Sequence, residues 1–409
     1  MISACFALFQ KSGANVFSSS FVISISFLST SKIPPQRTKA LYNTFNLFGI
    51  CHIYCSFVTA KISFHSETME INLISDTVTK PSHEMLHYMM QAKVGDDVYK
   101  QDPTVIELET IIANIFGMEA AMFFPSGTMA NQTAIKLHTQ PGEQLICDKW
   151  AHVYNYEGGG ASFNSGVSCC LLDGDRGMIT ADQVLAAINP PEFFHSPLTS
   201  LVCVENTTNK GGGACYDTLE LAKIRAVCDD HNLKFHLDGA RLWNALVARR
   251  ENPKQYGKIF HTISVCLSKG LGAPIGSVLV GDKETIHRAL RIRKILGGGM
   301  RQAGYLAAAG IYALKNNVSR LDEDHRRARE LAGILQKLPW VNNVEPVETN
   351  ILIFTVREPL KDTIVIEKLK QKSIFISAMG HGKLRIVTHL DYKGVMHDYV
   401  METLHKITF

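Results

Sequence analysis

The chain has 409 residues, of which 46% are apolar and 20% are charged, enough for one large domain and a smaller one. Its net charge of +4 falls on residues 1–68, where five lysines and arginines face one acid, and the remainder is formally neutral. This distribution excludes an electrostatic basis for binding nucleic acid.

Residues 1–68 differ from the rest in composition. They are rich in serine and poor in acids, which is typical of an organelle transit peptide, but they hold one arginine and show no amphipathic helix. No stretch has the roughly 18 continuous apolar residues of a membrane span. Alternatively, the natural chain starts at Met69. We expect this extension to be poorly ordered and outside the catalytic fold. We expect a cytoplasmic protein unless the extension directs it to mitochondria or plastids.

From Met69 onward, strand-like and helix-like segments alternate. Short apolar strands are predicted at 121–124, 144–148, 167–172, 200–205, 234–238 and 262–268. Helices are predicted at 129–139, at 181–188 after Thr180 as N-cap, and at 218–232, with a long helical region at 283–338. The last 70 residues alternate strands at 341–347, 350–356, 374–378 and 383–389 with helices near 362–371 and at the C-terminus.

Short strands that are apolar on both faces and separated by helices predict a mostly parallel sheet covered on both sides. The fold class is therefore α/β. We expect residues 69–315 to form a large domain and residues 316–409 a smaller α+β domain. Active sites in such sheets lie at the carboxyl ends of the strands.

Ten cysteines, most of them in apolar contexts, favour reduced core thiols in an intracellular protein. The sequence contains neither a C-x-x-C pair nor an H-E-x-x-H motif, so it predicts no metal site.

Two predicted strand ends carry a carboxylate and an amine. Asp238 lies in "HLDGAR", and Lys269 lies in "CLSKGLG" 31 residues later. Alone, Asp238 is better explained as a helix cap or as a partner of Arg241. A buried lysine, however, is expected to have a lowered pKa and to act as a nucleophile. Together, the two residues are what pyridoxal 5′-phosphate (PLP) requires: an amine that binds it covalently and a carboxylate that pairs with its ring nitrogen.

Two further segments complete a PLP site in this interpretation. In "PSGTMAN", Gly127 permits close backbone approach and Thr128 supplies a hydroxyl at a helix N-terminus, which favours a phosphate. Alone, this motif is a weak signal, equally typical of a turn with an N-cap. His152, in "AHVYNYEGGG", follows the next strand, where an imidazole can stack on the ring. A lone histidine is more often structural, so His152 gains weight only from its neighbours.

Taken together, these motifs resemble those of the low-specificity L-threonine aldolases, which are PLP enzymes of the aspartate aminotransferase fold. The resemblance runs in order from about Ile71 to the C-terminus through "SDTVTKPS", "VGDDVY", "PSGTMAN", "AHVYNYEGGG", "ENTTN", "HLDGARLWNA", "CLSKGLGAPIGS", "GGGMRQAG" and "RIVTHLD". It implies a PLP-dependent transferase-like fold. It also implies a lyase that cleaves L-threonine or L-allo-threonine into glycine and acetaldehyde, in threonine catabolism and glycine biosynthesis.

The resemblance also implies roles for individual residues. Those assigned to the cofactor are Lys269, which binds it covalently, Asp238, Arg241, Gly127, Thr128 and His152. Arg301, in "GGGMRQ", is expected to reach the cofactor phosphate of a neighbouring subunit in a homotetramer with active sites at subunit interfaces. Ser75 and Arg385 are expected to hold the substrate carboxylate, for which the planar fork of an arginine is suited.

The general base that accepts the hydroxyl proton stays open among His152, His195 and a water molecule held by both. Two positions depart from the family pattern. Thr208 stands where a histidine is usual, and Lys100-Gln101 stands where a glycine and an acid are usual. The preference between threonine and allo-threonine also stays open.

Two other functions compete with this interpretation. One is another PLP enzyme of the same fold, an aminotransferase or a β-eliminating lyase acting on a small amino acid. The other is a paralogue without enzymatic activity. We expect an amino-acid substrate and no nucleic acid or membrane partner.

Overall fold

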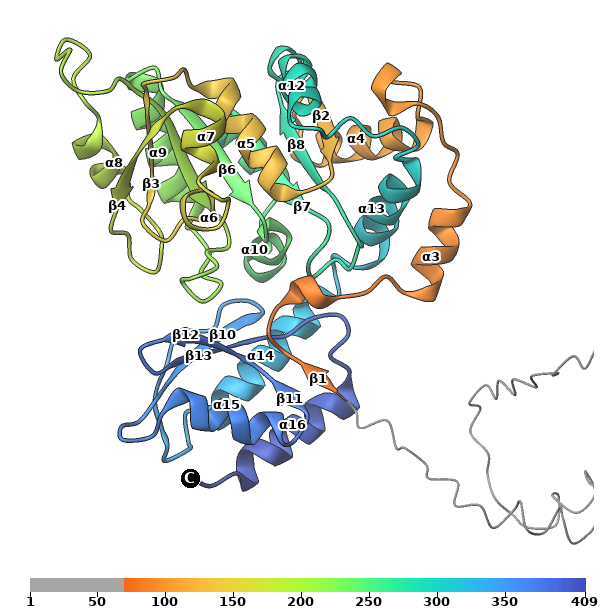
Figure 1. Ribbon diagram of the computed structural model, residues 1–409, viewed down its shortest axis with the longest axis vertical. Helices are drawn as coiled ribbons and strands as arrows, with labels where there is room; N and C mark the ends of the chain where they lie inside the picture. The colour runs from red at the N-terminus through yellow and green to blue at the C-terminus, as the bar shows by residue number, and fades with distance from the viewer. Residues whose placement is uncertain (1–69) are drawn as a thin grey trace, which may run out of the picture. The chain divides into compact units, whose positions relative to one another are not determined.

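The computed structural model of this chain describes residues 70–409 (Figure 1). The predicted extension at 1–68 lies outside the described residues. Every helix within 70–409 is too short or too polar to cross a lipid bilayer.

The large sheet has the strand order β2-β8-β7-β6-β5-β3-β4. Strands β3 to β7 run parallel, and β8 pairs antiparallel with both β2 and β7. This confirms the predicted α/β class, although β8 was not predicted from the sequence. The bounds are β2 Ala120–Phe124, β3 Gln144–Asp148, β4 Ser168–Leu172, β5 Thr199–Glu205, β6 Lys234–Gly239, β7 Thr262–Cys266 and β8 Ser277–Gly281.

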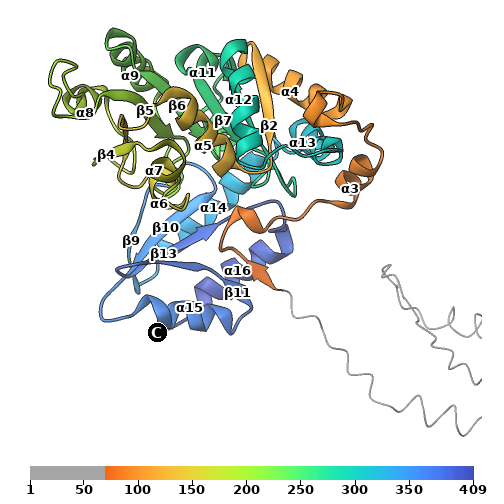
Figure 2. The same cartoon turned by 45° about the horizontal axis from the view of Figure 1, so that its top comes forward.

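Helices cover both faces of this sheet (Figures 1 and 2). One face carries α5 (Gly127–His138), α6 (His152–Asn155), α7 (Gly160–Ser165) and α12 (Lys283–Ile295). The other carries α4 (Pro103–Phe116), α8 (Ala181–Ala187), α9 (Thr218–Asp230), α10 (Leu242–Arg249), α11 (Pro253–Ile259) and α13 (Gly304–Asn316). Burial of Val202, Phe235 and Ile263 between these layers explains why the strands read as apolar runs.

A second, four-stranded antiparallel sheet has the order β12-β13-β10-β9. Its strands are β9 Val341–Val344, β10 Ile351–Val356, β12 Ser377–Gly380 and β13 Lys383–Val387. It packs on α14 (Leu321–Leu335), α15 (Asp362–Lys370) and α16 (Gly394–Lys406), drawn in blue in Figure 1. The predicted strand at 374–378 is split, because β11 (Ile374–Phe375) turns away to pair with β1 (Ile71–Asn72).

The long helical region predicted at 283–338 consists of α12, α13 and α14. Gly297, with φ 83°, follows the end of α12, and α13 does not begin until Gly304. The described chain also has α3 (His83–Met90) and two short 3-10 helices, η1 (Asp76–Val78) and η2 (Asp97–Tyr99). The domain boundary at 315/316 stays a prediction. Because β1 pairs with β11, the segment at 71–72 joins the C-terminal part of the chain.

Parallel pairing aligns the strand ends that carry the predicted chemistry. Glu205 pairs in register with Asp238, and Asp238 with Ser264 on β7, five residues before Lys269. Since all three strands point the same way, their carboxyl ends meet at one edge of the sheet.

Lys100 ends η2 in the left-handed region, with φ 59°. Its ammonium pairs with Glu109 at 3.2 Å. A glycine adopts this backbone conformation without the steric conflict of a Cβ atom. This explains why glycine suits the position where this chain departs from the family pattern.

We therefore expect Lys100→Gly to be more stable than Lys100→Ala by about 1 kcal/mol. Both substitutions remove the ion pair with Glu109, so they differ only in the cost of the positive φ. Thermal unfolding of the two variants measures the difference. An unfolding midpoint for the alanine variant at or above that of the glycine variant would contradict this account.

Candidate functional site

Lys269 lies three residues beyond β7 and is held from two sides. Its Nζ donates to Cys266 Sγ at 3.0 Å, and its carbonyl accepts a hydrogen bond from Thr79 at 2.9 Å. Burial disfavours the ammonium form, but the Cys266 sulfur and the Asp238 carboxylate together outweigh it, so the pKa of Lys269 lies above its ordinary value. The expected lowering of this pKa is therefore wrong for the chain alone, because it left out an acceptor beside the amine.

Cys266 also connects Lys269 to the start of α5. The Ser277 hydroxyl donates to the same sulfur at 3.1 Å. A Cβ atom at Gly127, the first residue of α5, would lie 2.8 Å from Cys266 Sγ and 3.4 Å from Ser277 Oγ. The helix N-terminus with Gly127 and Thr128 thus lies against the pair that contacts Lys269. This close approach needs a glycine and fits a phosphate held by backbone N–H groups.

Asp238, at the end of β6, has one satisfied and one free carboxylate oxygen. Its Oδ1 accepts from the Ala240 N–H at 3.1 Å. Its Oδ2 is buried and has no hydrogen-bond partner among residues 70–409. A buried carboxylate oxygen without a partner is costly, so its retention points to a ligand that donates to it. The ring nitrogen of PLP is such a donor, and the residues present fit this cofactor.

His152 begins α6 and forms an ion pair with Glu157, whose side chain is fully buried. The distance from His152 Nδ1 to Glu157 Oε1 is 3.0 Å. Burial lowers the pKa of His152, but Glu157, Asp238 and Glu205 together outweigh it and raise the pKa above its usual value. The three carboxylates therefore favour the protonated imidazole more than water does around a free histidine.

His152, Glu157 and Asp238 lie close enough to share a metal ion, within 4.8 Å of one another. Both oxygens of Glu157, however, already accept hydrogen bonds, because Asn131 and Gln132 donate to it at 2.8 and 2.6 Å. The Glu157 carboxylate therefore has its hydrogen-bonding capacity used by Asn131, Gln132 and His152. This arrangement gives no preference for a metal ion over PLP at the site.

Glu205 ends β5 next to Asp238. Its two oxygens accept the backbone N–H groups of His152 at 3.0 Å and Asn209 at 2.9 Å. Burial and the negative charge of Asp238 raise the pKa of Glu205 to about 7. Glu205 thus fixes two loops of the site, because each of its oxygens accepts a backbone N–H from one of them.

Arg241 follows β6 and is paired with Asp76. Its Nε and Nη2 reach the two carboxylate oxygens at 2.8 and 2.6 Å, and both side chains are buried. Burial alone would raise the pKa of Asp76, but Arg241 holds it below its ordinary value. Asp76 belongs to the "SDTVT" segment, so this pair brings that segment to the end of β6. The partner of Arg241 is Asp76, not Asp238.

Arg385, on β13, lies beside the same cluster. Its Nη1 donates to Asn209 Oδ1 at 3.0 Å and its Nη2 to the Ile74 carbonyl at 3.2 Å, next to Ser75. Its Nε is buried without a hydrogen-bond partner among the described residues. A guanidinium with a free N–H beside Ser75 suits a carboxylate ligand.

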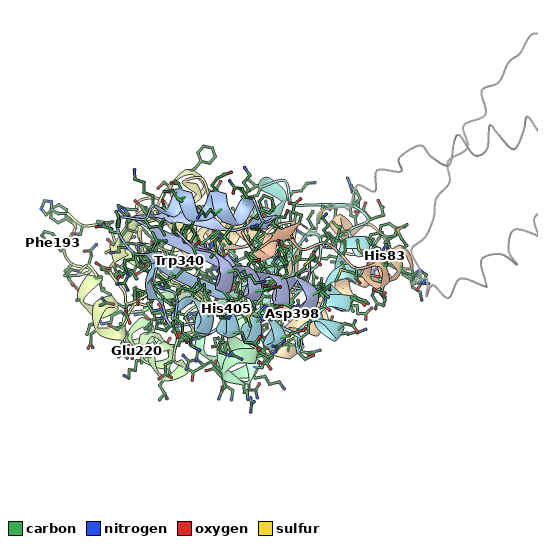
Figure 3. All side chains as sticks on the ribbon, turned by 90° about the horizontal axis from the view of Figure 1, so that it is seen from below. His83, Phe193, Glu220, Trp340, Asp398 and His405 are labelled. Atoms are coloured by element: carbon green, nitrogen blue, oxygen red, sulfur yellow. The ribbon has the colours of Figure 1, made fainter. Side chains whose placement is uncertain are left out.

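Two predicted residues lie away from this cluster. His195 is exposed in the loop between α8 and β5, where its ring contacts Phe193 and Phe194. Figure 3 shows Phe193 at the outer edge of the molecule. Arg301 is half exposed and pairs with Asp96 at 2.7 Å. The single chain does not bring either residue to Lys269.

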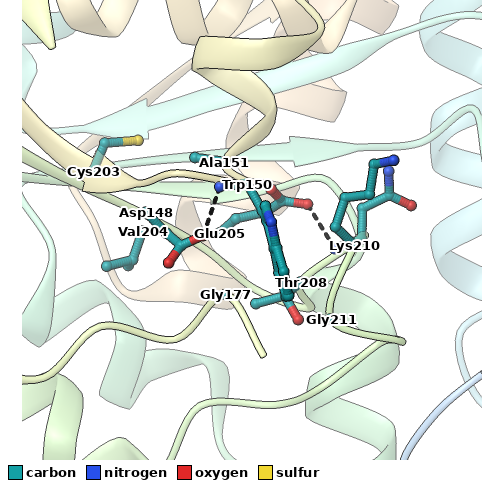
Figure 4. A pocket seen from close by; sticks show the side chains of 11 residues that line it. Asp148, Trp150, Ala151, Gly177, Cys203, Val204, Glu205, Thr208, Lys210 and Gly211 are labelled. Atoms are coloured by element: carbon teal, nitrogen blue, oxygen red, sulfur yellow. Dashed lines mark hydrogen bonds between the residues drawn. The ribbon is translucent and has the colours of Figure 1, made fainter. Parts of the chain in front are cut away.

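Thr208, the other departure, is buried in a small hollow lined also by Asp148, Trp150 and Glu205 (Figure 4). Its Oγ1 has no hydrogen-bond partner within 70–409, and a Cβ at Gly211 would approach it to 2.4 Å. The threonine lies in the loop that follows Glu205 and does not alter the contacts of Lys269 or Asp238.

Sequence reasoning missed Asp76, Glu157, Cys266 and Asn209 as members of the site. All four lie inside segments that carry the family resemblance. A test for buried charge balance could have found the first two, since Arg241 and His152 each needed an anion. Cys266 and Asn209 have no such signal, because their contacts depend on side-chain positions across the fold.

We predict that Glu157→Gln lowers the pKa of His152 in the cofactor-free protein, because it removes the carboxylate that hydrogen-bonds the ring. Histidine hydrogen–deuterium exchange read by mass spectrometry measures this pKa, and Glu192→Gln, at an exposed position, serves as control. Folding raises this pKa, so the pair stabilises the protein fully below the unfolded pKa of about 6.5, and this stabilisation is lost as pH rises through the folded value. An unchanged pKa in Glu157→Gln would refute the assignment.

Comparison with known proteins identifies the family. The sequence pattern of the family described as "Beta-eliminating lyase" matches residues 72–359. A low specificity L-threonine aldolase of Escherichia coli K12 is 43% identical over 78% of this chain and 94% of its own length. A probable low-specificity L-threonine aldolase 2 of Arabidopsis thaliana is 39% identical over 82% and 97%.

Solved structures confirm the fold. A threonine aldolase of Leishmania major aligns with a TM-score of 0.72 at 21% identity, over 82% of this chain and 99% of that one. A putative L-allo-threonine aldolase of Listeria monocytogenes aligns with a TM-score of 0.71 at 20% identity, over 83% and 97%. SPT with bound PLP aligns with a TM-score of 0.63 at 15% identity, over 82% and 86%. The chain therefore belongs to the Beta-eliminating lyase family and, within it, to the low-specificity L-threonine aldolases.

Proposed function

We propose that this protein is a PLP-dependent aldolase that cleaves L-threonine and L-allo-threonine into glycine and acetaldehyde. The observation that carries the proposal is the free, buried Oδ2 of Asp238 on the strand next to the one that delivers Lys269. The names of the Escherichia coli and Arabidopsis relatives, at 43 and 39% identity, support threonine as the substrate.

PLP, when bound, withdraws the electron pair left at Cα after the bond to Cβ breaks. In this proposal, Lys269 holds the cofactor covalently through Nζ and Asp238 keeps its ring nitrogen protonated. The N-terminus of α5, with Gly127 and Thr128, holds the phosphate. His152 lies against the ring, and Glu157 fixes its orientation.

Arg385 and Ser75 select the reaction by holding the substrate carboxylate. With that group fixed, one of the three bonds at Cα stands perpendicular to the ring, and orientation decides which bond breaks. Asn209 restricts Arg385 to one position, because it accepts from Nη1 while the Ile74 carbonyl accepts from Nη2. Nε and the second N–H of each of Nη1 and Nη2 are then the donors left for the substrate.

The base that takes the hydroxyl proton is proposed among His152, His195 and a water molecule. The carboxylates around His152 raise its pKa, which favours its protonated form relative to a free histidine. His195 and the water molecule stay open as acceptors beside His152. In this scheme the loop of His195 moves toward the site or comes from another subunit.

A homotetramer is part of the proposal, with Arg301 reaching the cofactor phosphate of a neighbouring subunit. Arg301 is half exposed and paired with Asp96, so this arrangement requires its guanidinium to contact the phosphate beside Asp96 or in its place. The compartment is proposed as cytoplasmic, or organellar if residues 1–68 act as a transit peptide.

A second candidate is a β-eliminating lyase or aminotransferase, and the description of the matched family favours the lyase. The geometry at Arg385 and Asp238 serves all three reactions. The products distinguish them: the aldolase releases acetaldehyde and glycine from threonine, elimination releases ammonia and a keto acid, and transamination releases a keto acid while a second keto acid takes up the amino group.

We predict that the full chain with PLP releases equal amounts of acetaldehyde and glycine from L-threonine. Lys269→Ala is expected to lower this rate by about a thousandfold or more, since no other amine stands at the strand end. Coupled aldehyde assays and amino-acid analysis measure both products. Keto acid without acetaldehyde would overturn the aldolase proposal, and full activity in Lys269→Ala would overturn the assignment of the lysine.

A further inference from the structure

A groove of about 330 Å³ lies beside the proposed site. Trp150, Tyr156 and Lys210 line it from the large sheet's loops, and Met379, His381 and Lys383 line it from the β12–β13 hairpin. Its volume lies within the range of small-molecule sites. None of the residues that line this groove is acidic.

Three features place the groove next to the proposed site. The Tyr156 ring lies 5.6 Å from the His152 ring, measured between centroids. Lys210 follows Asn209, whose side chain accepts from Arg385. Lys383 stands two residues before Arg385 on β13, so both side chains emerge on the same face of the sheet. The groove therefore lies next to residues that contact the group assigned to the substrate carboxylate.

The charge of the groove is carried mainly by Lys210. Its ammonium lies 5.6 Å from the centre of the Tyr156 ring and forms no ion pair with any of residues 70–409. Lys383, by contrast, pairs with Glu345 at 2.7 Å. Lys210 is thus available to an anion of the ligand.

The walls are aromatic and accessible. The exposed fractions of Trp150 and Tyr156 are 38 and 47%, large for such rings. Aromatic walls accept a flat apolar group by edge or face contacts. Lys210, a cation in the lining of this groove, favours a negative charge on such a group.

We propose that this groove receives the β-substituent of β-hydroxy-α-amino acids in which an aromatic ring carries an anionic group, such as a para carboxylate. This inference rests on the proposed aldolase function and names a substrate class for it. The bonds changed are the same: Cα–Cβ breaks, the hydroxyl loses its proton, Cα gains one, and the products are glycine and an aryl aldehyde.

The test compares kcat/KM for 4-carboxyphenylserine and phenylserine, with L-threonine as a third substrate. The ratio of the charged to the neutral aryl substrate is the measured quantity. We expect Lys210→Met to lower this ratio by about threefold or more, the scale of a partly exposed charge pair. Lys210→Arg is expected to retain the ratio, as is the control Lys223→Met, which alters an exposed lysine on α9.

Salt provides a measurement on the unaltered protein. Since screening weakens a partly exposed charge pair, the wild-type ratio is expected to fall as ionic strength rises. A ratio that is the same in wild type and Lys210→Met, or that does not respond to salt, would overturn the subsite. Failure of the proposed function is a separate outcome, because it would show as loss of threonine and phenylserine cleavage in the wild type.

Discussion

The buried ion pair between Arg241 and Asp76 is the interaction on which the arrangement of the site depends. Both side chains are nearly inaccessible, and Asn350 from the small sheet's domain donates to Asp76 at 3.2 Å. The pair thus joins the N-terminal segment, the end of β6 and the C-terminal part of the chain. Breaking a buried pair of this kind typically costs about 3–5 kcal/mol, because one charge is left without a partner. Its loss would remove a contact that holds the Ser75 segment and Asn350 at the end of β6.

Charge balance explains how so many ionisable groups are held at one sheet edge. Asp76 neutralises Arg241 and Glu157 pairs with His152, and each carboxylate also accepts amide hydrogen bonds. Asp238 Oδ2 and Arg385 Nε are two of the ten buried side-chain atoms that have no hydrogen-bond partner within residues 70–409. One accepts and the other donates, and these are the groups assigned to the cofactor ring and to the substrate carboxylate.

The sequence predicted the parallel strands closely, since apolar runs between helices are typical of a sheet buried on both faces. It did not predict β8, because "SVLV" follows a glycine-rich turn and reads as a continuation of the preceding strand. Lys269 and Asp238 were predicted because their burial demands a reason. Asp76 and Asn209 were not predicted as partners of Arg241. They lie 165 and 32 residues away from it in the sequence, and only the folded chain brings them together. The exposed positions of His195 and Arg301 also lay beyond the reach of sequence reasoning, which located them by analogy alone.

The central claim is that the end of β7 delivers an amine to PLP while Asp238 faces the cofactor ring. Borohydride reduction of the PLP-loaded protein, followed by mass mapping of its peptides, tests this claim most directly. The account predicts one cofactor per chain, fixed on Lys269, with loss of the visible absorbance on reduction. Label on another lysine, or a protein that stays colourless and unlabelled with PLP present, would contradict it.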